Sequence, residues 1–162
     1  MRLYQNRGMF TESLVKNSIH WYYTNNIAFF QKNHVPIKLS NVDKNNKKIH
    51  GYIAKSGLDY YGLYQGKYIE FEVKETENNV FELSQLKRHQ LEQMQRIKQF
   101  QGISFLILNF ITVEKIFFIT ADQIDHFKKN KISKITLEWC DQNAKELPIH
   151  FPGIIKWLDL IE

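Results

Sequence analysis

The chain has 162 residues, of which 43% are hydrophobic, a formal net charge of +5 and one cysteine. This length suits one domain with its own hydrophobic core, so residues 1–162 are expected to fold as a unit. Cys140 has no partner for an intramolecular disulfide, and no run approaches the ~18 apolar residues of a membrane span. The N-terminus also lacks the apolar core of a signal peptide, and we expect a soluble, cytoplasmic protein without membrane contact.

Positive charge is concentrated in the N-terminal part of the chain. Residues 1–67 contain ten Lys or Arg against three Asp or Glu, which is +7, and the remainder carries −2. Such asymmetry favours contact with a polyanion. A solvated basic surface in a Lys- and Asn-rich chain explains the charge equally well.

The N-terminal half is predicted to contain a helix followed by strands. Residues 11–25 have apolar residues at helical spacing, with Thr11 as the expected N-cap. Strands are expected at 27–30 and, interrupted by a proline, at 34–42. Residues 43–58 are polar, basic and aperiodic, which predicts an exposed excursion.

The C-terminal half is predicted to alternate strands and helices. The expected elements are a strand hairpin over 59–74, a helix over 84–101, strands over 103–110 and 115–120, and helices over 120–129 and 152–161. Ser84 and Thr120 are the expected N-caps, and Gly102 suits a helix C-terminus. Together the elements predict an α/β fold in which helices flank a mixed central β-sheet.

Apolar and charged residues alternate strictly in the stretch YIEFEVK, residues 68–74. Glu70, Glu72 and Lys74 share one face of the predicted strand, and the apolar residues share the other. If Gln65 and Gly66 form a two-residue loop, paired residue numbers sum to 131.

In this register Asp59 stands directly opposite Glu72. Opposed side chains have Cβ atoms roughly 4.5–5.5 Å apart, where like charges repel. A divalent cation compensates, because Mg²⁺ binds carboxylate oxygens and keeps several waters, so two acids can share one ion. Lys74 emerges on the same face, within reach of a phosphate oxygen or an activated water. The alternative register contains a bulge, which shifts the pairing by one residue.

The predicted helix over 84–101 has a polar residue inside its apolar stripe. Leu86 and Met94 belong to this stripe, and Gln90 occupies the position between them. A polar residue there needs a partner or faces a cavity. Its amide could orient a cation-bound water or complete the coordination sphere; the alternative is a satisfied amide without a function.

The acids of the hairpin have two explanations. An Asp separated by twelve intervening residues from Glu-x-Lys, the hairpin geometry and the basic N-terminal half favour a metal-dependent nuclease, since phosphodiester cleavage benefits from a cation at the phosphate. The alternative is an exposed strand whose charges stay solvated and neutralise one another.

The motifs together resemble those of the RecU-type Holliday junction resolvases of the PD-(D/E)xK nuclease superfamily. They are NRGM at 6–9, DYYGLYQGKYIEFEVKET at 59–76, HQLEQM at 89–94 and GISFLILNF at 102–110, and the resemblance is collinear over nearly the whole chain. It implies a restriction-endonuclease-like core, a single nuclease domain over 1–162 and a protruding stalk over about 43–58.

The resemblance also implies roles for individual residues. Asp59 and Glu72 would bind Mg²⁺, with Mn²⁺ as an alternative, Lys74 would stabilise the transition state, and Gln90 would belong to the metal site. Glu12 matches an acidic catalytic position on the first helix; its alternative is a charge that complements the helix N-terminus. Glu70 shares the face of Glu72 but has no role in the family.

The chain departs from the family pattern at Gly57. Relatives usually carry STTDY, with a threonine two residues before the aspartate that assists the metal, whereas this chain has SGLDY. We expect this ligand to be lost, or replaced by the Gly57 carbonyl or a water. The departure puts metal affinity and turnover in question.

The resemblance places DNA contacts in the stalk and near the N-terminus. The expected contacts are Arg7, Lys47, Lys48, Tyr52 and Lys55. Tyr52 would stack on an exposed junction base, and the alternative is that it packs against its own domain.

The sequence thus predicts a homodimeric, Mg²⁺-dependent endonuclease that resolves four-way junction DNA by paired nicks. Recombinase and branch-migration motor proteins are the partners that the resemblance implies. The alternatives are a related nuclease acting on linear duplex or flaps, a junction-binding or recombinase-modulating protein with weakened catalysis, and an unrelated α/β domain.

Overall fold

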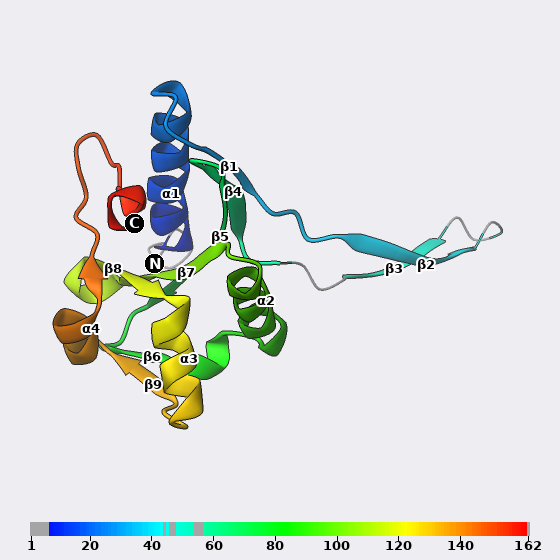
Figure 1. Ribbon diagram of the computed structural model, residues 1–162. Helices are drawn as coiled ribbons and strands as arrows, with labels where there is room; N and C mark the ends of the chain where they lie inside the picture. Colours follow the sequence, from blue (N-terminus) through cyan, green and yellow to red (C-terminus); the bar gives the residue numbers. More distant parts are fainter. Residues whose placement is uncertain (1–6, 44, 46–47, 54–56, 162) are drawn as a thin grey trace, which may run out of the picture.

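The computed structural model describes residues 7–43, 45, 48–53 and 57–161 (Figure 1). The helices are α1 (Arg7–Thr24), α2 (Arg88–Gln99), α3 (Ala121–Lys129) and α4 (Leu137–Asn143), and the 3-10 helices are η1 (Leu83–Gln85), η2 (Ile111–Val113) and η3 (Trp157–Leu160). The strands are β1 (Phe29–Lys32), β2 (Ile37–Asp43), β3 (Lys48–Ile53), β4 (Tyr60–Tyr64), β5 (Lys67–Thr76), β6 (Val80–Glu82), β7 (Ile103–Phe110), β8 (Lys115–Thr120), β9 (Lys134–Thr136) and β10 (Lys145–Glu146).

A six-stranded sheet with the order β1-β4-β5-β7-β8-β10 forms the centre of the molecule. Strands β5 and β7 are parallel and every other neighbouring pair in this sheet is antiparallel, so the sheet is mixed. Helix α1 covers one face, and α2 and α3 cover the other (Figure 1). The predicted α/β fold with a mixed central sheet flanked by helices is confirmed.

The two faces of the sheet bury separate apolar clusters. In β7, Phe105 and Ile107 pack on the α1 side, whereas Leu106 and Leu108 pack on the α2 and α3 side. All four are fully buried, which is why this strand reads as a continuous apolar run. The lone Cys140 is also buried, and desolvation raises the pKa of its thiol to about 12, so it behaves as a small core residue.

Strands β2 and β3 form a two-stranded hairpin that projects far from the body of the molecule (Figure 1). The hairpin begins at Ile37, earlier than the excursion expected over 43–58, and strand β3 within that range was not predicted. The two strands pair with each other and not with the central sheet, so neither shows the alternation of a half-buried strand. None of the helices in the described part of the chain has the length and apolar character of a membrane span.

The turn between β4 and β5 has the predicted register. Gln65 and Gly66 have φ values of 49° and 77°, as a two-residue turn with two positive φ values requires. Tyr64 pairs with Lys67 and Tyr60 with Phe71, so the residue numbers sum to 131 along the hairpin. The pairing therefore directs the chain just before β4 toward Glu72, and the bulged alternative is wrong.

The predicted N-cap at Thr11 is wrong. Helix α1 already includes Arg7, and Thr11 lies inside it with a buried side chain. Its hydroxyl donates to Glu75 Oε2 at 2.8 Å and accepts from Asn109 Nδ2 at 2.8 Å. A tertiary contact with the sheet, and not a helix end, explains this threonine.

The predicted N-cap at Ser84 is also wrong, whereas the cap at Thr120 is confirmed. Ser84 lies in the 3-10 helix η1, after which an extended Leu86 and Lys87 lead into α2. Thr120 Oγ1 accepts from the Gln123 N–H at 3.1 Å, as an N-cap should. Leu83, just before Ser84, and Leu86, two residues after it, are both buried, and their burial fixes this break before α2.

The C-terminal helix expected over 152–161 is reduced to the single turn η3. The backbone N–H of Ile155 donates to Ser18 Oγ at 2.8 Å, and that of Leu158 donates to the Tyr22 hydroxyl at 3.1 Å. Hydroxyls of α1 therefore bind amides of this segment, whose helical turn η3 lies beside α1 (Figure 1).

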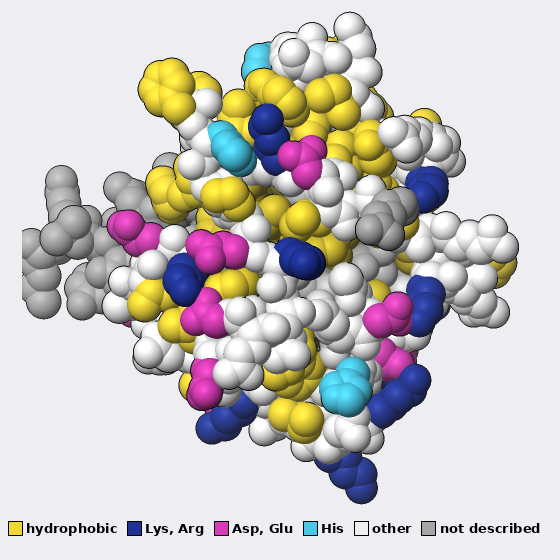
Figure 2. All heavy atoms as spheres, turned by 60° about the vertical axis from the view of Figure 1, so that its left-hand side comes forward, with side chains coloured by type: hydrophobic (Ala, Val, Ile, Leu, Met, Phe, Trp, Pro, Cys, Tyr) yellow, Lys and Arg dark blue, Asp and Glu magenta, His cyan; other side chains and the backbone are white. Residues whose placement is uncertain are grey.

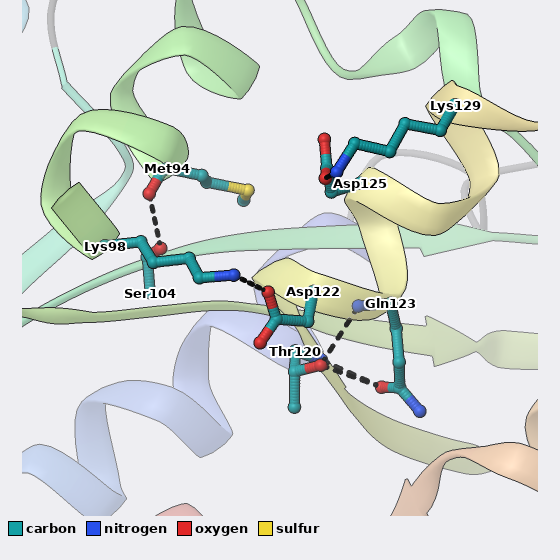
Figure 3. Close-up of polar contacts among 8 residues, drawn as sticks. All are labelled: Met94, Lys98, Ser104, Thr120, Asp122, Gln123, Asp125 and Lys129. Atoms are coloured by element: carbon teal, nitrogen blue, oxygen red, sulfur yellow. Dashed lines mark hydrogen bonds and ion pairs between the residues drawn. The ribbon is translucent and has the colours of Figure 1, made fainter.

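Helix α2 is fixed to its neighbours by polar contacts near its C-terminal half (Figure 3). The Ser104 hydroxyl of β7 donates to the Met94 carbonyl at 3.2 Å, and Lys98 forms an ion pair with Asp122 of α3. Met94 and Ile97 are buried against the sheet on the inner face of α2. These contacts hold the helix that carries Gln90.

Candidate active site

Glu72, on strand β5, is the most buried acid of the β4–β5 hairpin, with 0% of its surface exposed. Its Oε1 accepts from Lys74 Nζ at 2.6 Å and from Gln90 Nε2 at 2.6 Å, and its Oε2 accepts from the Asp59 N–H at 3.2 Å. Three elements therefore converge on one carboxylate: strand β5, helix α2 and the segment before β4.

Asp59 immediately precedes β4 and lies opposite Glu72, as the predicted register requires. Its Oδ2 accepts from the Val73 N–H at 3.0 Å, and its carbonyl accepts from the Asn33 N–H at 2.7 Å. These bonds fix both the backbone and the carboxylate of Asp59. The structure thus brings Asp59, Glu72 and Lys74 together.

The electrostatics of this cluster suit a cation. Burial raises the pKa of Glu72 above its ordinary value of 4.5, and the nearby Asp59 charge raises it further, whereas Lys74 and Gln90 oppose the shift. Two acids face each other, and Lys74 is the ammonium that contacts Glu72. Carboxylate oxygens are the ligands that Mg²⁺ prefers, so the donor set fits a divalent cation. Among the described residues, no group of three or more His, Cys, Asp or Glu is arranged to hold a metal.

Gln90 lies at the site and contacts Glu72 directly. Its side chain is buried, and its Oε1 accepts from the Lys87 N–H at 2.9 Å while its Nε2 donates to the carboxylate. In this arrangement the amide orients Glu72 and completes the first turn of α2. The expectation that this position in the stripe has a polar partner is confirmed; direct metal coordination by Gln90 stays a prediction.

Glu12 lines the same pocket as Asp59 and Lys74, a cavity of about 340 Å³ at the end of β5. It forms ion pairs with Lys32 at 2.5 Å and Lys16 at 3.1 Å, and these two ammonium groups lower its pKa. Because α1 already includes residue 7, Glu12 lies beyond the first helical turn, and the alternative role at the helix N-terminus is wrong.

Sequence reasoning missed the polar chain behind this pocket. Thr11 and Glu75 line the cavity, and Asn109 supports Thr11 from the buried strand β7. Within the described residues, Asn109 Oδ1 is buried without a hydrogen-bond partner. The one available signal was an Asn within the otherwise apolar run ILNF.

Sequence reasoning also missed the contacts of Glu70, which is 1% exposed. Its carboxylate accepts from the Leu58 N–H at 2.5 Å, from the Tyr68 hydroxyl at 3.0 Å and from Gln93 Nε2 at 2.8 Å. Burial, followed by the Glu70 charge, raises the pKa of Tyr68 to about 12, so this phenol stays protonated and donates.

Gly57 lies beside Glu70 and not in open space. A Cβ at this position would be 2.0 Å from Glu70 Oε1 and 2.9 Å from Asn33 Nδ2. A larger residue would collide with the buried carboxylate. Coordination of a metal by the Gly57 carbonyl stays a prediction.

Among the predicted DNA contacts, Tyr52 is on strand β3 of the projecting hairpin, with 56% of its surface exposed. Its predicted alternative, packing against its own domain, is wrong. Lys47 and Lys55 lie outside the described residues, as do the side chains of Arg7 and Lys48.

Known proteins match this chain over nearly its full length. Residues 6–162 match the family model described as Recombination protein U, RecU. A protein of Ureaplasma parvum named Holliday junction resolvase RecU is 39% identical over 97% of this chain and 92% of its own length. A protein of the same name from Bacillus subtilis is 31% identical over 98% of this chain and 81% of its own length.

Among solved structures, the Holliday junction resolvase Hjc of Archaeoglobus fulgidus superposes with a TM-score of 0.41 at 12% identity, covering 71% of this chain and 72% of its own. The family model and the full-length relatives establish the assignment. The chain belongs to the RecU family.

Proposed function

We propose that the protein is a structure-selective endonuclease that resolves four-way DNA junctions by paired symmetric nicks, with Mg²⁺ as cofactor. The observation that supports this most strongly is the Asp59–Glu72 pair across the β4–β5 hairpin, with Lys74 on the same face. The proposed substrate, a four-way junction, is supported by relatives that are named Holliday junction resolvase and are 39% and 31% identical to this chain.

Asp59 and Glu72 would hold the cation. When bound, Mg²⁺ supplies charge neutralisation at the scissile phosphate and a nucleophile near neutral pH. Gln90 and the Asp59 N–H orient the Glu72 carboxylate, and the Val73 N–H orients that of Asp59. Lys74 is one-quarter exposed and directs its ammonium toward the site, where it can contact a phosphate oxygen.

The distribution of charge supports DNA contact through the N-terminal half. Four lysines of the C-terminal half form ion pairs with acids: Lys98 with Asp122, Lys115 with Asp141, Lys129 with Asp125 and Lys134 with Glu82. Figure 2 shows a face on which acidic and basic side chains are interspersed and no patch of one sign forms. By sequence, residues 1–67 carry a net charge of +7, and this part of the chain includes the projecting β2–β3 hairpin. Lys32 of this part lies in the active-site pocket, where it pairs with Glu12.

The projecting hairpin is the element that would recognise the branch. A continuous duplex has no branch point for such a projection to enter, whereas a four-way junction has one at its centre. The exposed Tyr52 and Leu39 are apolar side chains on the hairpin that bases at the branch point can contact.

Replacing Tyr52 with alanine should weaken junction binding while leaving duplex binding unchanged. Stacking on one base is worth about 1–3 kcal/mol, or about 5- to 150-fold in the dissociation constant. Gel-shift titrations with a junction and a linear duplex in EDTA provide the measurement. Phe100→Ala, which removes an exposed aromatic ring at the C-terminal end of α2, is the matched control. Equal loss for junction and duplex would contradict the proposed role.

A homodimer is part of the proposal, because two sites related by a two-fold axis suit a substrate of similar symmetry. Strand β1 is an edge of the central sheet. Phe29 and its cross-strand partner Leu63 are exposed apolar side chains at this edge, as expected of a surface that a second copy covers. Contacts with recombinase and branch-migration motor proteins stay predictions.

The test is incubation of the protein with a synthetic mobile four-way junction and Mg²⁺. The expected result is nicks at matching positions in two opposite strands, with little cleavage of a linear duplex or flap of the same sequence. Equal cleavage of junction and duplex would favour a nuclease with another substrate. Absence of nicks in both Mg²⁺ and Mn²⁺, with tight junction binding in EDTA, would favour the alternative that Gly57 suggests, a junction-binding protein with weakened catalysis.

A further inference from the structure

Two acids of β5 hold the segment 57–59 through consecutive backbone N–H groups. The Leu58 N–H donates to Glu70 Oε1 at 2.5 Å, and the Asp59 N–H donates to Glu72 Oε2 at 3.2 Å. The two acids are two residues apart on one strand face, and both are essentially fully buried. The segment that carries Asp59 is therefore attached at two successive points.

Helix α2 holds both acids in the same way. Gln93 Nε2 donates to the second oxygen of Glu70 at 2.8 Å, and Gln90 Nε2 donates to the second oxygen of Glu72 at 2.6 Å. Residues three apart lie on one helix face, so the two amides reach the two carboxylates side by side. Each carboxylate thus joins α2 to one N–H of the segment 57–59, and Glu70 repeats the arrangement of Glu72.

Glycine at position 57 leaves the space that the Glu70 carboxylate occupies. A Cβ there would lie 2.0 Å from Glu70 Oε1, far inside any contact distance. The φ of Gly57 is outside the left-handed region, so the backbone conformation does not require glycine and the lack of space does. Burial of a carboxylate whose partners are neutral donors costs folding free energy. The contact between Glu70 and Leu58 therefore calls for a functional reason.

We propose that Glu70 and Gln93 are positioning residues for the metal site. They hold the Leu58 N–H, and through it the carboxylate of Asp59, at the distance from Glu72 that one cation requires, and Gly57 is the residue that makes room for them. This inference rests on the proposed function, because it assigns the clamp to a cation held by Asp59 and Glu72.

The experiment compares Mn²⁺ affinity by titration calorimetry, without DNA, in the native chain and in variants. Glu70→Ala and Gly57→Ala are each expected to weaken Mn²⁺ binding about 10- to 100-fold, the effect typical of residues that orient metal ligands. The double variant Gly57→Ala/Glu70→Ala should bind Mn²⁺ no more weakly than Glu70→Ala alone, because the steric collision requires both the Cβ at position 57 and the Glu70 carboxylate. Glu70→Gln keeps an acceptor for the Leu58 N–H, so it should stay within a few-fold of the native affinity.

Gly66→Ala is the control for a general loss of stability. Its φ of +77° penalises alanine, nothing lies within 4 Å of its Cβ, and it is at the far end of the β4–β5 hairpin. It should lower the melting temperature without changing Mn²⁺ affinity. A second readout, hydrogen exchange of the Leu58 amide, should show protection in the native chain and its loss in Glu70→Ala.

Native Mn²⁺ affinity in Glu70→Ala and Gly57→Ala, with only the melting temperature lowered, would overturn the proposal. A loss in Glu70→Gln as large as in Glu70→Ala would also overturn it, because Glu70 would then act through its charge. These outcomes differ from a failure of the proposed function. In that case the native chain binds no Mn²⁺ and cleaves no junction, while the Leu58 amide is still protected by Glu70.

Discussion

Replacing Asp59 with asparagine is expected to abolish junction cleavage and to leave junction binding within about twofold of the native value. Asparagine keeps an oxygen that can accept from the Val73 N–H, so the segment before β4 retains its conformation. It loses the charge that faces Glu72 and would hold the cation. Residues that merely orient a metal ligand cost about 10- to 100-fold when changed, so loss of the ligand itself should lower the cleavage rate by at least about 100-fold.

Single-turnover cleavage in Mg²⁺ and gel-shift binding in EDTA measure the two effects separately. Asp122→Asn is the matched control, because it removes an acid that pairs with Lys98 on the surface between α2 and α3, away from the pocket. This control should cleave at the native rate. Cleavage by Asp59→Asn at a rate near that of the control would contradict the assignment of Asp59.

Replacing Glu72 with glutamine is expected to abolish cleavage and, in EDTA at pH 8, to stabilise the fold. Burial and Asp59 raise the pKa of Glu72 in the folded state, so the folded protein binds this proton more tightly than the unfolded chain does. At a pH above the raised pKa, the ionised acid therefore destabilises the fold, and glutamine removes this cost. The expected result is a higher melting temperature for Glu72→Gln than for the native chain at this pH.

The raised pKa of Glu72 also makes the stability of the fold depend on pH. As the pH falls through the interval between the raised pKa of Glu72 and its ordinary value of 4.5, the native chain should gain stability relative to Glu72→Gln. Thermal unfolding of both proteins from pH 8 to pH 4 in EDTA measures the difference. Added Mg²⁺ should stabilise the native chain and not the variant. A variant less stable than the native chain at pH 8 in EDTA would contradict this account of the site.

The hairpin geometry of the site could be predicted from the sequence because it depends on local rules. Gln65 and Gly66 specify a two-residue turn, and the alternation in β5 specifies which residues share a face. Together they place Asp59 opposite Glu72 and Lys74 beside it. Gln90 was found through a different local signal, an interruption of the apolar stripe on α2.

The features that the sequence did not reveal depend on tertiary contacts. The segment over 152–161 has the composition of a helix, but Ser18 and Tyr22 of α1 bind two of its amides, and a helical turn forms only over 157–160. Similarly, Thr11 has the chemistry of an N-cap, whereas it is buried between Glu75 and Asn109.

Glu70 and Gly57 show the same limit within the site. An acid on the polar face of a strand produces the same alternation of apolar and charged residues whether it is solvated or buried. The alternation in residues 68–74 therefore could not reveal the buried contacts of Glu70. The sequence identifies Gly57 as the position where a metal ligand is missing. The folded structure is needed to see that the Glu70 carboxylate occupies the space beside it. A contact between residues 57 and 70 requires the complete hairpin and α2, which no local pattern specifies.

Asp59 and Glu72 are proposed to hold one divalent cation together, and every catalytic role assigned above depends on this. The most direct measurement is titration calorimetry of Mg²⁺ and Mn²⁺ into the native chain, Asp59→Asn and Glu72→Gln, each without DNA. We expect one cation per native chain and loss of binding in both variants. Undiminished binding in either variant, with the same stoichiometry as in the native chain, would contradict it.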